Sequence, residues 1–360
     1  MAHLFEPLKL RDVTLANRIG IPPMCQYSAH DGVAADWHFI HYGSRAVGGA
    51  GLMILEATAV MPEGRISPGD LGLWNDAQIE PLAHIARFAH EQGCAAAVQL
   101  AHAGRKASIG LGWEPQSSLG AQAGGWQTVA PSAISFGDGY ATPQALDDAG
   151  IRAIVAAFAA ATCRARAAGF PAIEIHAAHG YLLHQFLSPL SNRRTDAWGG
   201  SFENRSRLAR EVVAAARAEW PQHLPLLVRL SATDWVEGGW NVEETVELCR
   251  IFKGLGVDLV DVSSAGLLPT ARIPAGPGFQ TEFAERVRHE AGIPTAAVGL
   301  ITSPQQADHI IRSGQADMVL LGREMLRNPY WPLAAAQALG QTTAWPRQYL
   351  RAGPAGVAAR

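Results

Sequence analysis

Short runs of apolar residues recur along the chain, and most of them are followed by a longer stretch with helical spacing. The runs are continuous and do not alternate with polar residues, a pattern typical of parallel strands covered on both faces. We predict eight such strands, over Arg18–Pro22, Gly51–Ala57, Ala95–Leu100, Ala172–His176, Leu224–Leu230, Leu259–Ser263, Thr295–Gly299 and Met318–Gly322.

The amphipathic stretches between these runs predict helices. They cover Ile79–Glu91, Leu146–Ala168, Phe202–Trp220, Val242–Leu255, Thr281–Ala291 and Ser303–Ser313. Several stop at a residue type that commonly follows the last turn of a helix, namely at Gly93, Gly169, Gly256 and Gly314. Repeated alternation of strand and helix favours an α/β fold, a single (β/α)8 TIM barrel. A doubly wound sheet is the alternative, but no Gly-x-Gly-x-x-Gly motif follows the first strand and no linker divides the chain.

Two segments lie outside this repeating pattern. Leu8–Asn17 alternates around Asp12 and predicts a β-hairpin that closes the bottom of the barrel. Gly104–Pro143, after the third strand, is rich in Gly, Ser, Trp and Pro and is too long for a passive loop. We expect it to form a lid over the end of the barrel where the strands finish. The chain is thus expected to be one domain, residues 1–360, with a lid at about 104–143 and a C-terminal tail at about 340–360.

Composition narrows the class of protein. An apolar fraction of 48% excludes a disordered chain. With 29 basic against 32 acidic residues and no basic stripe, the charge argues against a nucleic-acid or acidic membrane partner. The N-terminus has no signal-peptide core, and no apolar run reaches the ~18 residues of a membrane helix. The four cysteines are far apart, which predicts no zinc, iron–sulfur or disulfide site and a cytoplasmic protein; they are Cys25, Cys94, Cys163 and Cys249.

Three polar aromatic side chains follow the fourth predicted strand, and catalytic groups of barrels come from strand ends. His176, His179 and Tyr181 lie within six residues. A pair of core histidines or a metal site would also explain them, but the metal reading lacks a third ligand. We favour a pair of donors that grip a carbonyl oxygen, with Tyr181 as a nearby proton donor.

Other strand ends carry charged or small residues. Arg229 closes the fifth strand and requires an anion; an ion pair with Asp234 or Glu174 is the structural alternative to a ligand. Gly299, with Gly322 and Arg323, resembles the phosphate site that barrels build after their last two strands.

Among the reactive residue types cysteine and lysine, only a cysteine lies at a predicted strand end. Cys25 follows the first strand, a position that distinguishes it from an inert buried thiol. None of the three lysines, Lys9, Lys106 and Lys253, lies at a strand end, which argues against Schiff-base aldolase chemistry.

Several longer motifs point to one family. They are Leu4–Pro7, Asn17–Ile19, Pro22–Tyr27, Gln99–Lys106, Ala130–Ile134, Glu174–Leu182 and Gly199–Arg205, of which the last two are highly specific in combination. Over nearly its whole length the chain resembles the Old Yellow Enzyme family of FMN-dependent ene-reductases. Cysteine at position 25 with Tyr27 resembles the thermophilic-like subclass that contains xenobiotic reductase A. The chain departs from the family pattern Arg-Thr-Asp-Glu-Tyr-Gly-Gly at Thr195–Gly199, where we expect an effect on loop packing more than on chemistry.

The resemblance implies roles for individual residues. Around the flavin ring it places Pro23, Met24, Cys25, Ala57 and Gln99, with Arg229 facing its N1 and O2 atoms. On the ribityl chain and phosphate it places Ser263, Gly299, Gly322 and Arg323. For the substrate it implies binding by Tyr27, His176, His179, Lys106 and Arg351, and Tyr181 as the acid.

The same resemblance implies a reaction and an assembly. NADPH or NADH reduces FMN, which passes the hydride to the β-carbon of an α,β-unsaturated carbonyl compound or a related activated alkene while Tyr181 protonates the α-carbon. We expect a homodimer or homotetramer in which Arg351 of the tail reaches the neighbouring active site. The alternatives are a flavin-binding or sensor protein without turnover, and a dienoyl-CoA-reductase relative, although the iron–sulfur cysteines of that group are missing.

Overall fold

Eight parallel strands form a closed barrel in this computed structural model, which describes residues 3–360. Around the barrel the strands follow one another in chain order and close on themselves. They are β3 (Ile19–Ile21), β4 (Leu52–Ala59), β5 (Ala95–Ala101), β8 (Ala172–Ala177), β9 (Leu226–Ser231), β10 (Leu259–Ser263), β11 (Thr295–Val298) and β12 (Met318–Leu320). Every predicted strand is present, and the predicted (β/α)8 barrel is confirmed.

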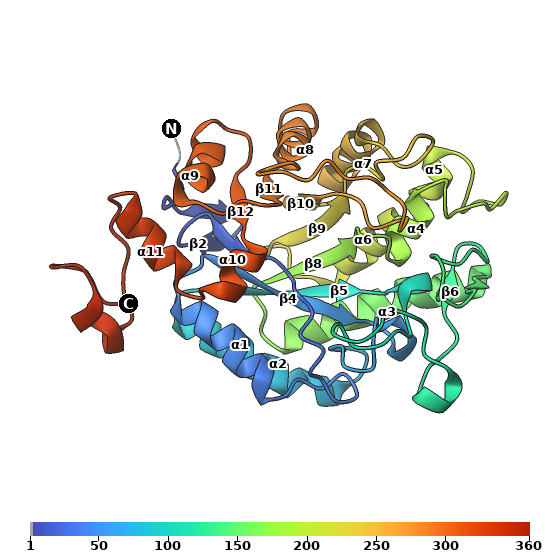
Figure 1. Ribbon diagram of the computed structural model, residues 1–360, viewed down its shortest axis with the longest axis horizontal. Helices are drawn as coiled ribbons and strands as arrows, with labels where there is room; N and C mark the ends of the chain where they lie inside the picture. The colour runs from blue at the N-terminus through green and yellow to red at the C-terminus, as the bar shows by residue number, and fades with distance from the viewer. Residues whose placement is uncertain (1–2) are drawn as a thin grey trace.

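Helices surround the barrel (Figure 1). They are α1 (Asp36–Val47), α2 (Ile79–Glu91), α3 (Asp148–Ala167), α4 (Leu182–Leu187), α5 (Phe202–Arg205), α6 (Arg207–Glu219), α7 (Val242–Gly254), α8 (Thr281–Arg286), α9 (Pro304–Arg312), α10 (Gly322–Arg327) and α11 (Trp331–Ala338). All six predicted helices exist, with two corrections. The helix predicted over Phe202–Trp220 is interrupted at Ser206, and the one predicted over Thr281–Ala291 continues after α8 as a π-helical turn, Val287–Ala291.

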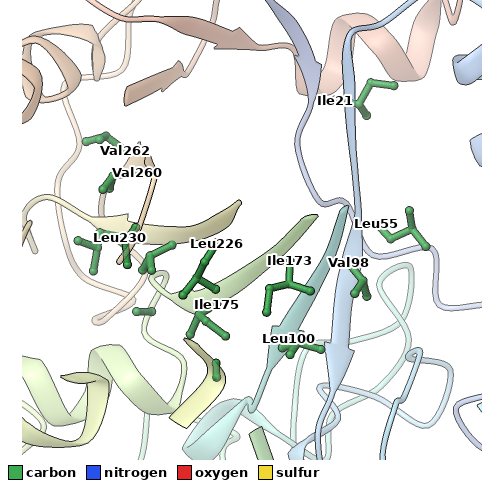
Figure 2. Close-up of a cluster of buried hydrophobic side chains, with 14 of the residues drawn as sticks. Ile21, Leu55, Val98, Leu100, Ile173, Ile175, Leu226, Leu230, Val260 and Val262 are labelled. Atoms are coloured by element: carbon green, nitrogen blue, oxygen red, sulfur yellow. The ribbon is translucent and has the colours of Figure 1, made fainter. Parts of the chain in front are cut away.

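The barrel wall separates two apolar cores. Side chains on the outer face of the strands, such as Leu55, Ile173 and Val260 in Figure 2, share one cluster with helix residues including Phe158. A smaller cluster fills the inside of the barrel where the strands begin, with Leu52, Ile54, Leu227, Leu259 and Met318 among its members.

The N-terminal hairpin closes this end of the barrel, as predicted. Its strands, β1 (Leu8–Leu10) and β2 (Val13–Leu15), pair antiparallel. Leu10 and Leu15 belong to the inner cluster, so the hairpin forms an apolar floor under the barrel.

The segment after β5 covers the opposite end. It contains only short turns and the pair β6 (Val129–Ala130) and β7 (Gln144–Ala145). Trp126 and Tyr140 from this segment pack against a small cluster that includes Ala57 and Ala101, which lie near the ends of β4 and β5. Within residues 3–360, no helix combines the length and the hydropathy needed to cross a bilayer.

Candidate functional site

The side chains inside the barrel change from apolar to polar along the strands. On β9 the inward positions are Leu227, Arg229 and Ser231, because alternate residues of a strand face the same side. On β10 they are Leu259, Asp261 and Ser263, and the register pairs Asp261 with Arg229. A polar layer therefore lies directly on the apolar floor.

A cavity of about 410 Å³ opens above this layer. It is lined by Pro22, Pro23, Met24, Arg229, Val298, Gly299, Leu300, Ile301, Thr302, Leu320, Gly322, Arg323, Glu324, Leu326 and Arg327. The structure thus brings together six residues that the sequence predicts for the cofactor, from four different strand ends: Pro23, Met24, Arg229, Gly299, Gly322 and Arg323. The loop Leu300–Thr302 and the side chains of Leu326 and Arg327 were missed, because no motif in the sequence marks them.

Gly299 occupies a position that requires glycine. Its φ is +122°, and an added Cβ would lie 2.7 Å from Nε2 of Gln280 and 3.0 Å from the ring of Phe279. Gln280 fixes the loop, since its amide donates a 2.8 Å hydrogen bond to the carbonyl of Val298 and accepts one of 2.5 Å from the hydroxyl of Ser264. The backbone at Gly299 is therefore held close to the cavity.

His176, His179 and Tyr181 form a second group. The ring centroid of His176 lies 5.2 Å from that of His179 and 5.0 Å from that of Tyr181. The Nε2 atom of His179 is 2.8 Å from the hydroxyl of Ser263, and the backbone N–H of His179 donates to Ser231 at 2.9 Å. Strands β9 and β10 thus position a residue that follows β8.

The protonation of this group suits hydrogen-bond donation. Burial, together with the positive charge of Arg229, lowers the pKa of both imidazoles well below the usual value. Both rings are therefore neutral near pH 7. Nδ1 of His176 accepts a 3.3 Å hydrogen bond from the backbone of Ala178, which places the proton of this ring on Nε2. Burial raises the pKa of the Tyr181 phenol well above its usual value, so it keeps its proton.

Cys25 packs on the same small apolar cluster as Tyr181, beside Ala57. Burial raises the pKa of its thiol well above the ordinary value, and the negative charges of Asp70 and Glu56 add to this effect. Cys25 is therefore a neutral thiol. Tyr27, two residues further, has a φ of +52° and packs edge-on against Trp113 of the lid segment, with ring centroids 5.9 Å apart.

Lys106, at the base of the lid segment, contacts the loop that carries His179. Its ammonium donates hydrogen bonds to the carbonyls of His179 (2.9 Å) and Gly266 (3.1 Å) and lies 4.9 Å from the ring centroid of Tyr181. Burial, assisted by the charge of Arg105, lowers the pKa of Lys106 to about 8. The predicted substrate contact stays a prediction; the contacts present show Lys106 supporting the backbone of His179.

The buried partner of Arg229 differs from both residues considered in the sequence. Its Nε lies 2.7 Å from a carboxylate oxygen of Asp261, whereas Asp234 pairs with His184 at 2.9 Å. Glu174 instead accepts a 2.8 Å hydrogen bond from the amide of Gln99. Asp261 was missed, although its spacing of two from both Leu259 and Ser263 marks it as an inward position.

Arg351, the remaining residue predicted for the substrate, lies away from the cavity. Arg351 is exposed on a 3-10 turn, Arg347–Ala352, in the tail after α11 (Figure 1), and does not line the cavity. The tail contacts its own chain through the hydroxyl of Tyr349, 3.5 Å from that of Tyr330, and through Arg360, which donates to the carbonyl of Val47. Within residues 3–360, no three His, Cys, Asp or Glu side chains are arranged to hold a metal ion.

Comparisons with known proteins identify the family of the chain. Residues 3–341 match the model of a family described as NADH:flavin oxidoreductase / NADH oxidase. The chain is 48% identical to an NADPH dehydrogenase of Listeria welshimeri over 98% of this chain and 99% of the relative. It is 49% identical to an NADPH dehydrogenase of Geobacillus thermodenitrificans over 97% and 98%.

Solved structures show the same barrel. Morphinone reductase in complex with tetrahydroNAD is 30% identical, with a TM-score of 0.78 over 96% of this chain and 93% of that chain. A 2-naphthoyl-CoA reductase complex has a TM-score of 0.85 but only 24% identity, and the match covers 94% of this chain and 52% of that chain. The second likeness shows the fold alone.

Proposed function

Because this chain belongs to the NADH:flavin oxidoreductase / NADH oxidase family, the Old Yellow Enzyme family, and is an NAD(P)H-dependent oxidoreductase that uses FMN, we propose that it is an ene-reductase. Its substrates are α,β-unsaturated carbonyl compounds or related activated alkenes. The observation that carries the proposal is the group of His176, His179 and Tyr181, in which two neutral imidazoles lie beside a protonated phenol.

The residues of the cavity fit FMN. Pro22, Pro23 and Met24 give it an apolar wall, and Arg229 supplies a buried cation for a ring that gains negative charge on reduction. Gly299 keeps the backbone open to a phosphate group, and Arg323 supplies a second cation. The residues that would hold the cofactor are Pro23, Met24, Cys25, Ala57, Gln99, Arg229, Ser263, Gly299, Gly322 and Arg323. When bound, FMN accepts a hydride from NADPH or NADH and supplies it to the substrate.

The chain's own residues bind the carbonyl oxygen of the substrate and supply the proton that its α-carbon receives. His176 and His179 donate hydrogen bonds to the carbonyl oxygen of the substrate, with Tyr27 nearby, and these bonds strengthen as negative charge develops on that oxygen. Tyr181 donates its phenolic proton to the α-carbon. Cys25 adjusts the flavin as a neutral thiol at its reactive edge.

Two further segments belong to the proposal. Residues 104–143 act as the lid, which is supported by the packing of Trp126 and Tyr140 on the cluster that also contacts Cys25 and Tyr181. The protein assembles as a homodimer or homotetramer in which Arg351 reaches the active site of the neighbour, a role consistent with its exposure and its absence from its own chain's cavity. The thermophilic-like subclass and the cytoplasmic location stay predictions.

Anaerobic spectroscopy tests the proposal. The purified protein should be yellow, NADPH or NADH should bleach it, and 2-cyclohexenone should restore the colour while the C=C bond is reduced. A protein that binds FMN but does not bleach would be a flavin binder without turnover. Bleaching that oxygen reverses but no enone, nitroalkene or maleimide reverses would exclude the ene-reductase.

A further inference from the structure

Four polar side chains from four neighbouring strands lie beneath the cavity as two pairs in register, and between the pairs the register sets Arg229 opposite His176 and Glu174 opposite Leu227. Gln99 on β5 is in register with Glu174 on β8, and Arg229 on β9 is in register with Asp261 on β10. The layer contains two carboxyl groups and one guanidinium group. Glu174 and Asp261 are both fully buried, and Arg229 is the only member that also lines the cavity.

The two carboxyl groups have unequal partners. Nε of Arg229 lies 2.7 Å from Oδ2 of Asp261, an ion pair by distance, although in the described part of the chain neither this Nε nor either oxygen of Asp261 has a partner with hydrogen-bond geometry. Glu174 receives only the neutral amide of Gln99, and its Oε2 atom has no hydrogen-bond partner in the described part of the chain. If Glu174 were also ionised, a second buried anion would stand near Asp261 with no cation of its own in this layer, and an uncompensated buried charge is strongly destabilising.

Few other charges face this layer. The floor below it is apolar, and β11 and β12 contribute Val298 and Leu320. Above it lie His176 and His179, which burial keeps neutral, and Lys106 beyond them. On the outer side of β4, Glu56 is bound to Tyr42 at 2.8 Å.

Burial raises the pKa of Glu174 to about 8, with the negative charge of Asp261 adding to the rise and Arg229 opposing it. Burial also raises the pKa of Asp261, to about 6, and Arg229 again opposes the rise. Of the two carboxyl groups, Glu174 therefore has the stronger tendency to hold a proton, because Arg229 lies against Asp261.

We propose that Asp261 is the positioning residue of Arg229 and sets the positive charge that Arg229 presents to the flavin, while Glu174 stays neutral and serves as a proton store below the site. The inference rests on the proposed place of Arg229 beside the flavin ring. According to this proposal, Asp261 and Glu174 together set the reduction potential of the flavin and the way in which that potential changes with pH.

Two isosteric variants of the FMN-loaded enzyme separate the roles of the carboxyl groups. In Asp261→Asn, measured in the Glu174→Gln background so that Glu174 cannot ionise in its place, Arg229 loses its counter-ion and favours reduced FMN. The ratio of the dissociation constants of oxidised and reduced FMN should rise at least about tenfold, a potential about 30 mV more positive for a two-electron couple. Glu174→Gln should leave the potential at pH 7 unchanged. An equal shift in both variants, or none in Asp261→Asn, would overturn the proposal.

The pH profile of the potential gives a second readout. Above about pH 8 Glu174 of the wild type loses its proton, the added negative charge disfavours reduced FMN, and the potential falls more steeply with pH than in Glu174→Gln. Lys106 titrates in the same range, but it is present in both proteins, so the difference between the profiles reports on Glu174. Parallel profiles would contradict the proposed proton store, and this comparison decides the matter if Asp261→Asn does not fold.

Arg229→Met separates a failure of this inference from a failure of the proposed site. It should make the potential more negative. An unchanged potential in Arg229→Met would mean that Arg229 does not face the flavin. A shift in Arg229→Met without one in Asp261→Asn would overturn only the role of Asp261.

Discussion

The ammonium group of Lys106 donates a 2.9 Å hydrogen bond to the backbone carbonyl of His179. His179 has a φ of +58°, so this carbonyl belongs to a residue in a strained left-handed conformation. The base of the lid segment thus holds in place the loop of His179, one of the two proposed donors for the substrate oxygen.

Replacing Lys106 by methionine should loosen that loop. Methionine keeps most of the aliphatic stem but removes the charged donor, and hydrogen bonds to charged groups contribute about 1.5–3 kcal/mol. We expect weaker binding of 2-cyclohexenone in stopped-flow reoxidation, with FMN content and reduction by NADPH within a few-fold of the wild type. Lys9→Met serves as the control, because Lys9 lies on the floor hairpin. Unaltered enone binding in Lys106→Met would refute the role of the contact.

Tyr181→Phe should divide the two halves of the catalytic cycle. It removes one hydroxyl group and keeps the ring, so packing should barely change. Reduction by NAD(P)H should stay within a few-fold of the wild type, whereas reoxidation by 2-cyclohexenone should slow by up to the ~10²–10⁴ that general-acid catalysis contributes. Equal slowing of both halves would require another acid.

His179→Ala provides the comparison for Tyr181→Phe. It removes a donor to the substrate oxygen, so it should weaken enone binding as well as slow the chemical step. A variant with unchanged enone affinity would remove His179 from the substrate site.

Enone reduction should not show the titration of an ordinary histidine. Because burial lowers the pKa of His176 and His179 well below the usual value, both rings stay neutral as the pH falls through 6.5. The dissociation constant of 2-cyclohexenone in stopped-flow reoxidation should therefore be constant from about pH 7.5 to 5.5, whereas the rate also follows the flavin potential and hence Asp261, with its pKa of about 6. A break near pH 6.5 would show that one ring is charged in the folded enzyme.

The same shifts predict a loss of stability in acid. Between the lowered pKa of the folded state and the ordinary value of about 6.5, the unfolded chain binds more protons than the folded one. The contribution of His176 and His179 to stability is thus present above that value and declines as the pH falls. Thermal unfolding of His176→Asn should show a smaller loss between pH 7 and 5 than that of the wild type.

Cys25→Ala should retain FMN but shift its reduction potential. The wild-type thiol is neutral because burial and the charges of Asp70 and Glu56 raise its pKa. Iodoacetamide should accordingly react slowly with Cys25 at pH 7.5, because thiolate is the reactive form. An unchanged potential and an unchanged rate of reduction would leave Cys25 as a packing residue only.

Arg351→Ala should test the assembly. If the tail supplies this arginine to a neighbour, substrate binding weakens while light scattering still reports an oligomer and the melting temperature is unchanged. A wild-type protein that is a fully active monomer would contradict the shared site.

Strand periodicity predicted the barrel and its floor, because buried parallel strands leave continuous apolar runs that few other structures imitate. Helix α4 was not predicted, because its sequence lacks a recognisable helical pattern of apolar and polar residues. All of its residues are buried, so it lacks the polar face by which a surface helix is recognised. Helix α1 was missed for the opposite reason, since its buried face includes His38, His41 and Arg45.

The site was predictable where residues follow strand ends and unpredictable where pairing depends on three dimensions. Motifs indicated His176 and Arg229, but the choice of Asp261 over Asp234 as the partner of Arg229 depends on register between strands. Likewise, nothing local in the sequence shows that the ammonium group of Lys106 donates its hydrogen bonds to the backbone carbonyls of His179 and Gly266, which lie far along the chain.

The hairpin under the barrel contributes to the stability of the fold but does not line the cavity. Leu10 and Leu15 belong to the same apolar cluster as Leu227, which precedes Arg229 by two positions on the same strand. Replacing a leucine of this floor by alanine should lower the free energy of unfolding by about 2–5 kcal/mol. It should leave the side chains that line the cavity unchanged. Stability can therefore be changed from this end of the barrel, two positions along β9 from Arg229, without altering the side chains that line the cavity.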